Sequence, residues 1–165
     1  MGEGFRNFLG FETPNSVLLD MLSKIGEQRT IESRGGEPLD MHWVPETLEE
    51  INEKTPNLLR EGYDYYKTSR GQHPNSVNKY LFTGTDRMLA FSAFDQIGRF
   101  LTQPFLLIIG SKADTKVFSD QAFSQAKGDK ELFVVEGATH IALYDIPEYF
   151  EQAIVKLVDF YSKKL

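Results

Sequence analysis

The stretch PFLLIIG, residues 104–110, decides the fold class of this chain. It is apolar at consecutive positions and ends in glycine, a pattern typical of a parallel β-strand covered on both faces. The stretch KELFVVEG, residues 130–137, has the same character, and residues 117–126 between the two can form a short helix. The segment 145–165 predicts a closing helix. The order strand, helix, strand, helix favours an α/β fold in which a right-handed crossover joins two parallel strands.

The start of the closing helix carries capping signals. Asp145 and Glu148 have the spacing of a capping box, and Pro147 between them suits the first helical turn.

The part of the chain before these strands predicts helices separated by loops, so residues 1–103 are expected to be mostly helical. One amphipathic helix covers 14–26, where Gly26 can stop it; a second restarts after Pro45; a third covers 85–101. We expect a single domain over residues 1–165, with the strand, helix, strand, helix unit at 104–165.

Three tyrosines, Tyr63, Tyr65 and Tyr66, are crowded into one short stretch. We expect them to line one helix face packed in a core, with their hydroxyl groups at its edge.

Composition and charge narrow the function classes. The chain has 165 residues, of which 41% are hydrophobic, and a formal net charge of −6, which disfavours a nucleic acid or an anionic membrane surface as partner. It has no cysteine, which removes disulfides and thiolate metal sites and fits a cytoplasmic location. Charges at Glu3, Arg6 and Glu12 argue against a signal peptide or a membrane span.

No histidine pair has metal-ligand spacing and no glycine-rich phosphate loop is recognised, so we expect no metal and no cofactor.

The residues that follow the two predicted strands carry the candidate chemistry. Asp114 follows the first strand and His140 follows the second. Parallel strands finish at the same edge of their sheet, so these two side chains are expected to meet there. A carboxylate beside an imidazole fixes the ring tautomer and leaves the other nitrogen free to accept a proton from a hydroxyl group. Taken alone, Asp114 is also a candidate N-cap for the helix that follows it.

Two loop motifs resemble those of the α/β-hydrolases, in particular the branch related to dienelactone hydrolase. The motif Gly110, Ser111, Ala113, Asp114 matches the acid loop of that family, and the motif Gly137, Ala138, Thr139, His140 matches its histidine loop. The resemblance implies a partial α/β-hydrolase fold, with a cap-like connecting region in residues 1–103 and with Asp114 and His140 as the acid and base of ester or related acyl-bond hydrolysis.

The nucleophile of that family is not found in this chain. A strained strand-to-helix elbow, usually Gly-x-Ser-x-Gly, exposes the serine, and no such pentapeptide occurs here. The stretches around Ser33 and Ser69 lack the first glycine and follow no hydrophobic strand, and the family gives Ser111 no nucleophilic role. The sequence therefore resembles the C-terminal half of such an enzyme, without its nucleophile-elbow half.

Two hypotheses follow. In the first, the chain is an α/β-hydrolase acting on a small ester-like substrate, with a serine supplied from elsewhere. In the second, it is a non-catalytic, hydrolase-derived oligomeric or binding module, or the product of a truncated gene. A sheet of two strands leaves an open edge, so we expect a homo-oligomer or a complementing N-terminal half to cover it. We expect His42 and His73 to be solvated or to brace loops.

Overall fold

The computed structural model describes residues 14–164. The predicted absence of a signal peptide, which depends on Glu3, Arg6 and Glu12, concerns residues outside this range. The chain forms two compact units, which we describe separately: the helical unit, residues 14–51 and 72–93, and the sheet unit, residues 52–71 and 94–164. The sequence suggested a boundary between a mostly helical region, residues 1–103, and a strand-containing region, residues 104–165. The two compact units are divided at other positions. The expectation of a single domain stays a prediction.

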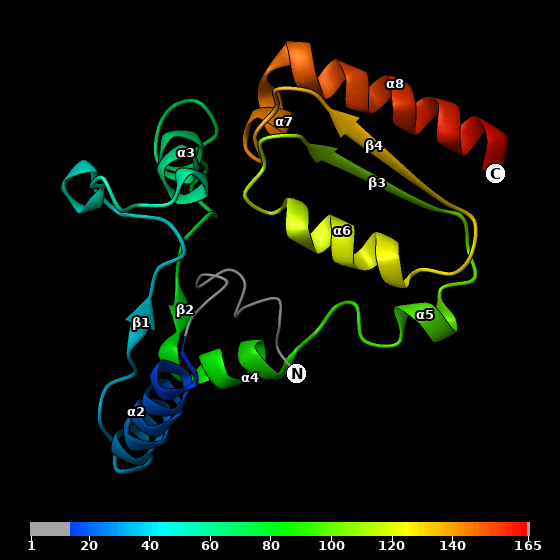
Figure 1. Ribbon diagram of the computed structural model, residues 1–165. Helices are drawn as coiled ribbons and strands as arrows, with labels where there is room; N and C mark the ends of the chain where they lie inside the picture. Colours follow the sequence, from blue (N-terminus) through cyan, green and yellow to red (C-terminus); the bar gives the residue numbers. More distant parts are fainter. Residues whose placement is uncertain (1–13, 165) are drawn as a thin grey trace. The chain divides into compact units, whose positions relative to one another are not determined.

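The sheet unit contains the strand, helix, strand, helix order predicted from sequence (Figure 1). Its elements are α3 (Asn57–Tyr66), α5 (Ile97–Phe100), β3 (Phe105–Gly110), α6 (Lys116–Gln125), β4 (Lys130–Val135), α7 (Ala142–Asp145) and α8 (Pro147–Lys164). β3 and β4 pair in parallel, with Phe105 opposite Lys130 and Gly110 opposite Val135. Figure 1 shows α6 on one side of this sheet and α8 on the other. The α/β prediction is therefore confirmed.

The core of the sheet unit is concentrated at the carboxyl ends of the strands. Ile109, Gly110 and Val135 are buried, whereas the first four residues of β3 are only half-buried. Ala138 and Ile141, in the segment after β4, are also buried. The sequence predicted a strand covered on both faces, and the described residues cover β3 fully only where it reaches the loops of the candidate site.

The helical unit holds one long helix and a short antiparallel strand pair. Its elements are α2 (Asn15–Ser33), β1 (Asp40–Met41), η1 (Leu48–Glu50), β2 (Tyr80–Leu81), η2 (Phe82–Gly84) and α4 (Thr85–Ala90). Asp40 lies opposite Leu81, and Met41 lies opposite Tyr80. This strand pair was not predicted from sequence.

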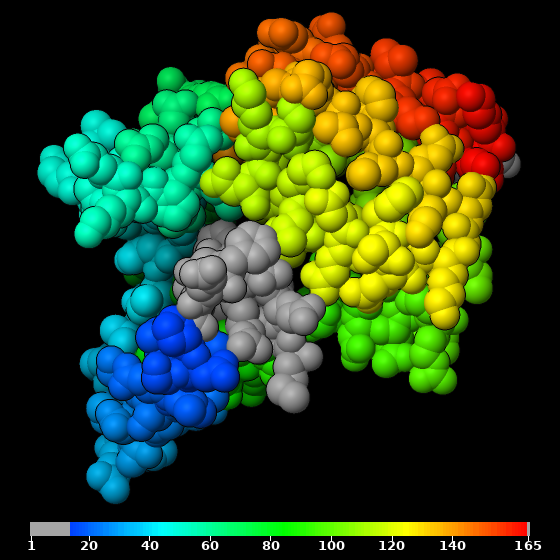
Figure 2. Space-filling view, viewed as in Figure 1, coloured from blue at the N-terminus to red at the C-terminus, as the bar shows by residue number. Residues whose placement is uncertain are grey.

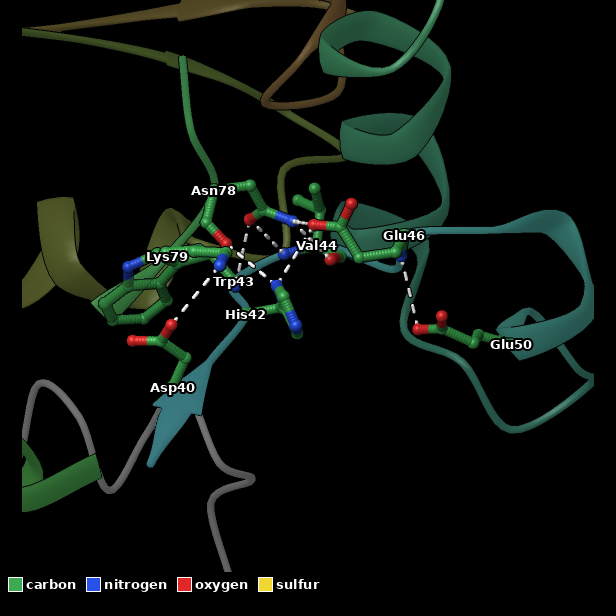
Figure 3. A network of polar contacts seen from close by, with 8 residues as sticks. All are labelled: Asp40, His42, Trp43, Val44, Glu46, Glu50, Asn78 and Lys79. Atoms are coloured by element: carbon green, nitrogen blue, oxygen red, sulfur yellow. Dashed lines mark hydrogen bonds and ion pairs between the residues drawn. The ribbon is translucent and has the colours of Figure 1, made fainter. Parts of the chain in front are cut away.

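Asn78 holds the segment after β1 against the segment before β2 (Figure 3). Its side-chain oxygen accepts hydrogen bonds from the backbone N–H groups of Trp43 and Val44, at 3.0 and 3.1 Å, and its amide donates to the Val44 carbonyl. Its φ of +42° lies in the left-handed region, which asparagine tolerates better than most residues. The His42 ring contacts the Asn78 carbonyl oxygen at 3.0 Å, which confirms the predicted loop-bracing role.

The other loop histidine also braces its own turn. Nδ1 of His73 accepts a hydrogen bond from the backbone N–H of Asn75 at 3.1 Å. Neither His42 nor His73 belongs to the sheet unit.

Three predicted helix boundaries before β3 are wrong. α2 continues past Gly26, since one glycine inside a helix costs only about 1 kcal/mol, and it ends just before Gly35, whose φ is +88°. The helix expected after Pro45 is a single 3₁₀ turn, because the side chain of Asn52 accepts the N–H of Lys54 and favours a turn there. The helix expected over 85–101 is divided into α4 and α5, which are separated by the left-handed Gln96 (φ +68°).

The start of the last helix also differs from its prediction. Pro147 is its first residue, as expected for a proline in the first turn. Ile146 rather than Asp145 therefore occupies the preceding cap position, so the predicted capping box is wrong by one residue. Asp145 ends α7, and its carboxylate binds Arg70 at 2.7 Å.

Candidate active site at the strand ends

The loops after β3 and β4 are hydrogen-bonded to each other. The hydroxyl of Ser111 accepts the N–H of Gly137 at 2.9 Å and donates to Glu136 at 3.1 Å. The N–H of Lys112 donates to the carbonyl of Ala138 at 2.9 Å. Gly137 has a φ of +79°, a conformation that favours glycine. These bonds bring the segments that carry Asp114 and His140 together at one edge of the sheet.

Both ring nitrogens of His140 contact hydroxyl groups. Nδ1 lies 2.7 Å from Oγ1 of Thr115, and Nε2 lies 2.8 Å from the hydroxyl of Tyr144. A neutral imidazole has one N–H donor and one acceptor nitrogen, so it donates to one of these hydroxyls and accepts from the other. If Nδ1 donates to Thr115, the lone pair of Nε2 faces the hydroxyl of Tyr144.

Asp114 lies in the adjacent loop, but its carboxylate makes a different hydrogen bond from the one expected. Oδ2 accepts the backbone N–H of Leu58 at 2.9 Å. Leu58 is the second residue of α3, so Asp114 caps that helix, and its negative charge lies at the positive end of the helix dipole. Thr115, the next residue, contacts the imidazole where the carboxylate of Asp114 was expected. The alternative prediction of Asp114 as an N-cap is correct in kind, but the helix it caps is α3 rather than α6.

Burial and charge act on His140 in opposite directions. Burial lowers the pKa of the imidazole below its usual value, while the negative charges of Asp114 and Glu61 raise it. The lowering by burial is the larger effect, so the ring is predominantly neutral at neutral pH. A neutral ring is able to accept a proton.

Tyrosines from α3 surround the hydroxyl group at Nε2. The rings of Tyr65 and Tyr144 are 5.2 Å apart, and those of Tyr66 and Tyr144 are 6.4 Å apart, all in edge-to-face arrangements. Burial, together with a hydrogen bond to Tyr66, raises the pKa of Tyr144 to about 12. Two of the three clustered tyrosines, Tyr65 and Tyr66, therefore form a wall of the candidate site, although Tyr144 itself remains 42% exposed.

Arg70 fastens α3 to α7 beside this wall. Its guanidinium donates two hydrogen bonds of 2.7 Å to Asp145 and one of 2.8 Å to Asp64, and it lies 5.5 Å from the ring centre of Tyr65. This arrangement fixes the end of α7 that carries Tyr144.

Sequence reasoning missed Thr115 and Tyr144. Tyr144 follows His140 by four residues, the spacing of neighbours on a helix face, so that signal was present in the sequence. Thr115 had no comparable signal. The candidate serines do not lie at a strand-to-helix elbow: Ser33 ends α2, and Ser69 is exposed after α3.

The described residues were also searched for a metal-ion site and for a membrane-spanning helix. In that range no group of three or more His, Cys, Asp or Glu side chains is arranged to hold a metal ion. Within the same range, no helix is long and apolar enough to cross a membrane.

The chain was compared with protein-family models, with curated protein sequences and with solved structures. No protein-family model matches the chain. It is 32% identical over 170 residues to the uncharacterized protein YcjY of Escherichia coli, an alignment that covers 100% of this chain and 53% of YcjY. The crystal structure of the hypothetical protein PA2218 from Pseudomonas aeruginosa superposes with a TM-score of 0.81 at 27% identity, covering 94% of this chain and 48% of that one.

A third similar structure is described as an α/β hydrolase, GrgF from Penicillium sp. sh18. Its TM-score is 0.65 at 14% identity, covering 88% of this chain and 49% of that one. The chain thus has a partial α/β-hydrolase fold, as predicted. It spans about half the length of YcjY.

Proposed function

We propose that this chain is the histidine-bearing half of an α/β-hydrolase of the dienelactone-hydrolase-related branch that hydrolyses an ester or related acyl bond. His140 acts as the general base and Asp114 as the acid that stabilises its protonated form. The observation that supports this proposal is the position of the Tyr144 hydroxyl, 2.8 Å from Nε2 of His140, because it marks the place where a nucleophilic serine hydroxyl would lose its proton to the ring.

The reaction needs a nucleophilic serine, and no Gly-x-Ser-x-Gly motif in this sequence supplies one. In the proposed scheme, that serine replaces the Tyr144 hydroxyl at Nε2 and attacks the acyl carbonyl while His140 takes its proton. His140 then returns the proton to the leaving alcohol, and a water molecule deprotonated by the same nitrogen releases the acid. Tyr144 is a poor nucleophile, because a pKa of about 12 keeps it protonated.

A chimera tests the proposal. This chain replaces the segment of YcjY that aligns with it, and the product is assayed with a fluorophosphonate probe and with p-nitrophenyl acetate. We expect labelling and turnover by the chimera, with His140→Ala lowering kcat at least about a hundredfold. His73→Ala, which removes a histidine from the helical unit, serves as the control. A folded chimera that is neither labelled nor active, or a His140→Ala variant with full activity, contradicts the proposal.

A second candidate is a non-catalytic, hydrolase-derived module that pairs with a second copy of itself. Apolar side chains on α8 and β4 favour it: Val155 is 69% exposed, Val158 61% and Val134 39%. The surface of α8, orange to red in Figure 2, is open on the face shown. Light scattering after gel filtration tests this candidate. We expect a dimer that a Val155→Glu, Val158→Glu double variant converts to a monomer, and a monomeric parent chain contradicts it.

A further inference from the structure

One buried carboxylate oxygen in the sheet unit is unused by the scheme above. Oε2 of Glu61 is shielded from solvent and has no hydrogen-bond partner within residues 14–164. A buried carboxylate oxygen without a partner loses its hydration and gains nothing in return, so it lowers stability. Such a group calls for an explanation other than folding.

The helix that carries Glu61 is attached to the candidate site at both ends. Leu58, in its first turn, donates to the carboxylate of Asp114, and Tyr65, in its last turn, packs against Tyr144. Glu61 and Tyr65 are four residues apart, so their side chains share the face of α3 on which Tyr65 contacts Tyr144. Glu61 therefore lies on the site-facing side of α3, between the two attachments.

We propose that Glu61 is a second positioning carboxylate for His140, which stabilises the imidazolium formed when the ring takes a proton. This inference deepens the proposed function and rests on His140 being the general base. Two features of the site require such a group. The carboxylate of Asp114 is engaged with α3, and the nearest neighbours of both ring nitrogens are uncharged hydroxyl groups.

The titratable side chains that act on the ring come from three elements. They are Asp114 from the loop after β3, Glu61 from α3 and Tyr144 from α7. Tyr144 is uncharged at neutral pH, so the two carboxylates supply the negative charge that favours a protonated ring. Removing either charge is expected to make His140 a weaker base.

The test is an NMR titration of the imidazole in the whole chain, with the His140 signals assigned from a His140→Gln spectrum. We expect Glu61→Gln to lower the His140 titration midpoint by about half a pH unit or more. Glu61→Asp keeps the charge but withdraws it by one methylene, so a smaller fall is expected. Glu151→Gln, an exposed change on α8, is the matched control and leaves the midpoint within about 0.1 unit.

Thermal unfolding separates this role from a structural one. Glu61→Gln removes the charge of a half-buried carboxylate whose shielded Oε2 has no hydrogen-bond partner in residues 14–164, so we expect a melting temperature equal to or above that of the parent chain. An unchanged His140 titration midpoint in folded Glu61→Gln overturns the inference. The inference is also overturned if Glu61→Asp leaves the midpoint unchanged and has a lower melting temperature than the parent chain.

The titration needs no enzymatic activity. An inactive chimera therefore contradicts the proposed hydrolase function, whereas an unchanged His140 midpoint contradicts the role of Glu61. In an active chimera, Glu61→Gln is expected to lower kcat at saturating substrate with little change in KM, because the carboxylate does not touch the substrate.

Discussion

Gly110 is the last residue of β3 and lies against the backbone of the histidine loop. A Cβ added at this position would lie 2.2 Å from the carbonyl oxygen of Ala138 and 2.7 Å from its carbonyl carbon. Both atoms belong to the backbone, so no side-chain rotation relieves the clash. A Gly110→Ala change must therefore push the histidine loop away from β3 by roughly 1 Å.

The cost of that movement follows from what it disturbs. Forcing an extra methyl group into a packed interior costs about 1–3 kcal/mol. The Ala138 carbonyl also accepts the N–H of Lys112 at 2.9 Å, and weakening that bond costs about 1 kcal/mol more. We expect Gly110→Ala to lower the free energy of unfolding by about 2–4 kcal/mol, a large share of the stability of an ordinary domain.

Urea unfolding followed by circular dichroism measures the effect, with Gly128→Ala as the matched control. A Cβ at Gly128 would meet the Leu101 carbonyl oxygen at 3.6 Å, an ordinary contact in the same sheet unit. We expect the control to unfold within about 0.5 kcal/mol of the parent chain. If Gly110→Ala is as stable as Gly128→Ala, the two loops do not pack as described, and the argument that brings Asp114 and His140 together fails.

Further predictions concern the contacts around the site. Tyr144→Phe removes the hydroxyl at Nε2 of His140, so diethyl pyrocarbonate is expected to modify that histidine several times faster than in the parent chain or in Tyr161→Phe. Arg70→Gln removes the bidentate pair with Asp145 and is expected to cost about 1–2 kcal/mol in urea unfolding at pH 7. The hydrogen bond from Arg70 lowers the pKa of Asp145, so this difference is present above about pH 4 and narrows as the pH falls through the lowered value. Burial lowers the pKa of His140, so the parent chain is expected to lose stability relative to His140→Gln as the pH falls below about 6.5; a constant difference between pH 8 and pH 5 contradicts this.

The local patterns explain why the helices before β3 were predicted less well than the strands. Gly26 is a weak helix breaker, and the continuation of α2 beyond it depends on residues that also tolerate other conformations. The division between α4 and α5 depends on one left-handed residue, Gln96, and glutamine carries no strong signal for that conformation. By contrast, the apolar runs that became β3 and β4 have no competing pattern.

The amino-acid sequence by itself determined the β-α-β-α order and the edge of the sheet at which Asp114 and His140 lie. Consecutive apolar residues make buried parallel strands, and parallel strands end on the same side. Only the tertiary structure decided which groups contact the imidazole: Thr115 and Tyr144 hold its nitrogens, while Asp114 caps a helix that begins more than fifty residues earlier in the chain. The physical reason is that a hydrogen bond depends on distances of a few tenths of an ångström between loops, and those distances are set by how helices pack on the strands rather than by the spacing of residues along the chain.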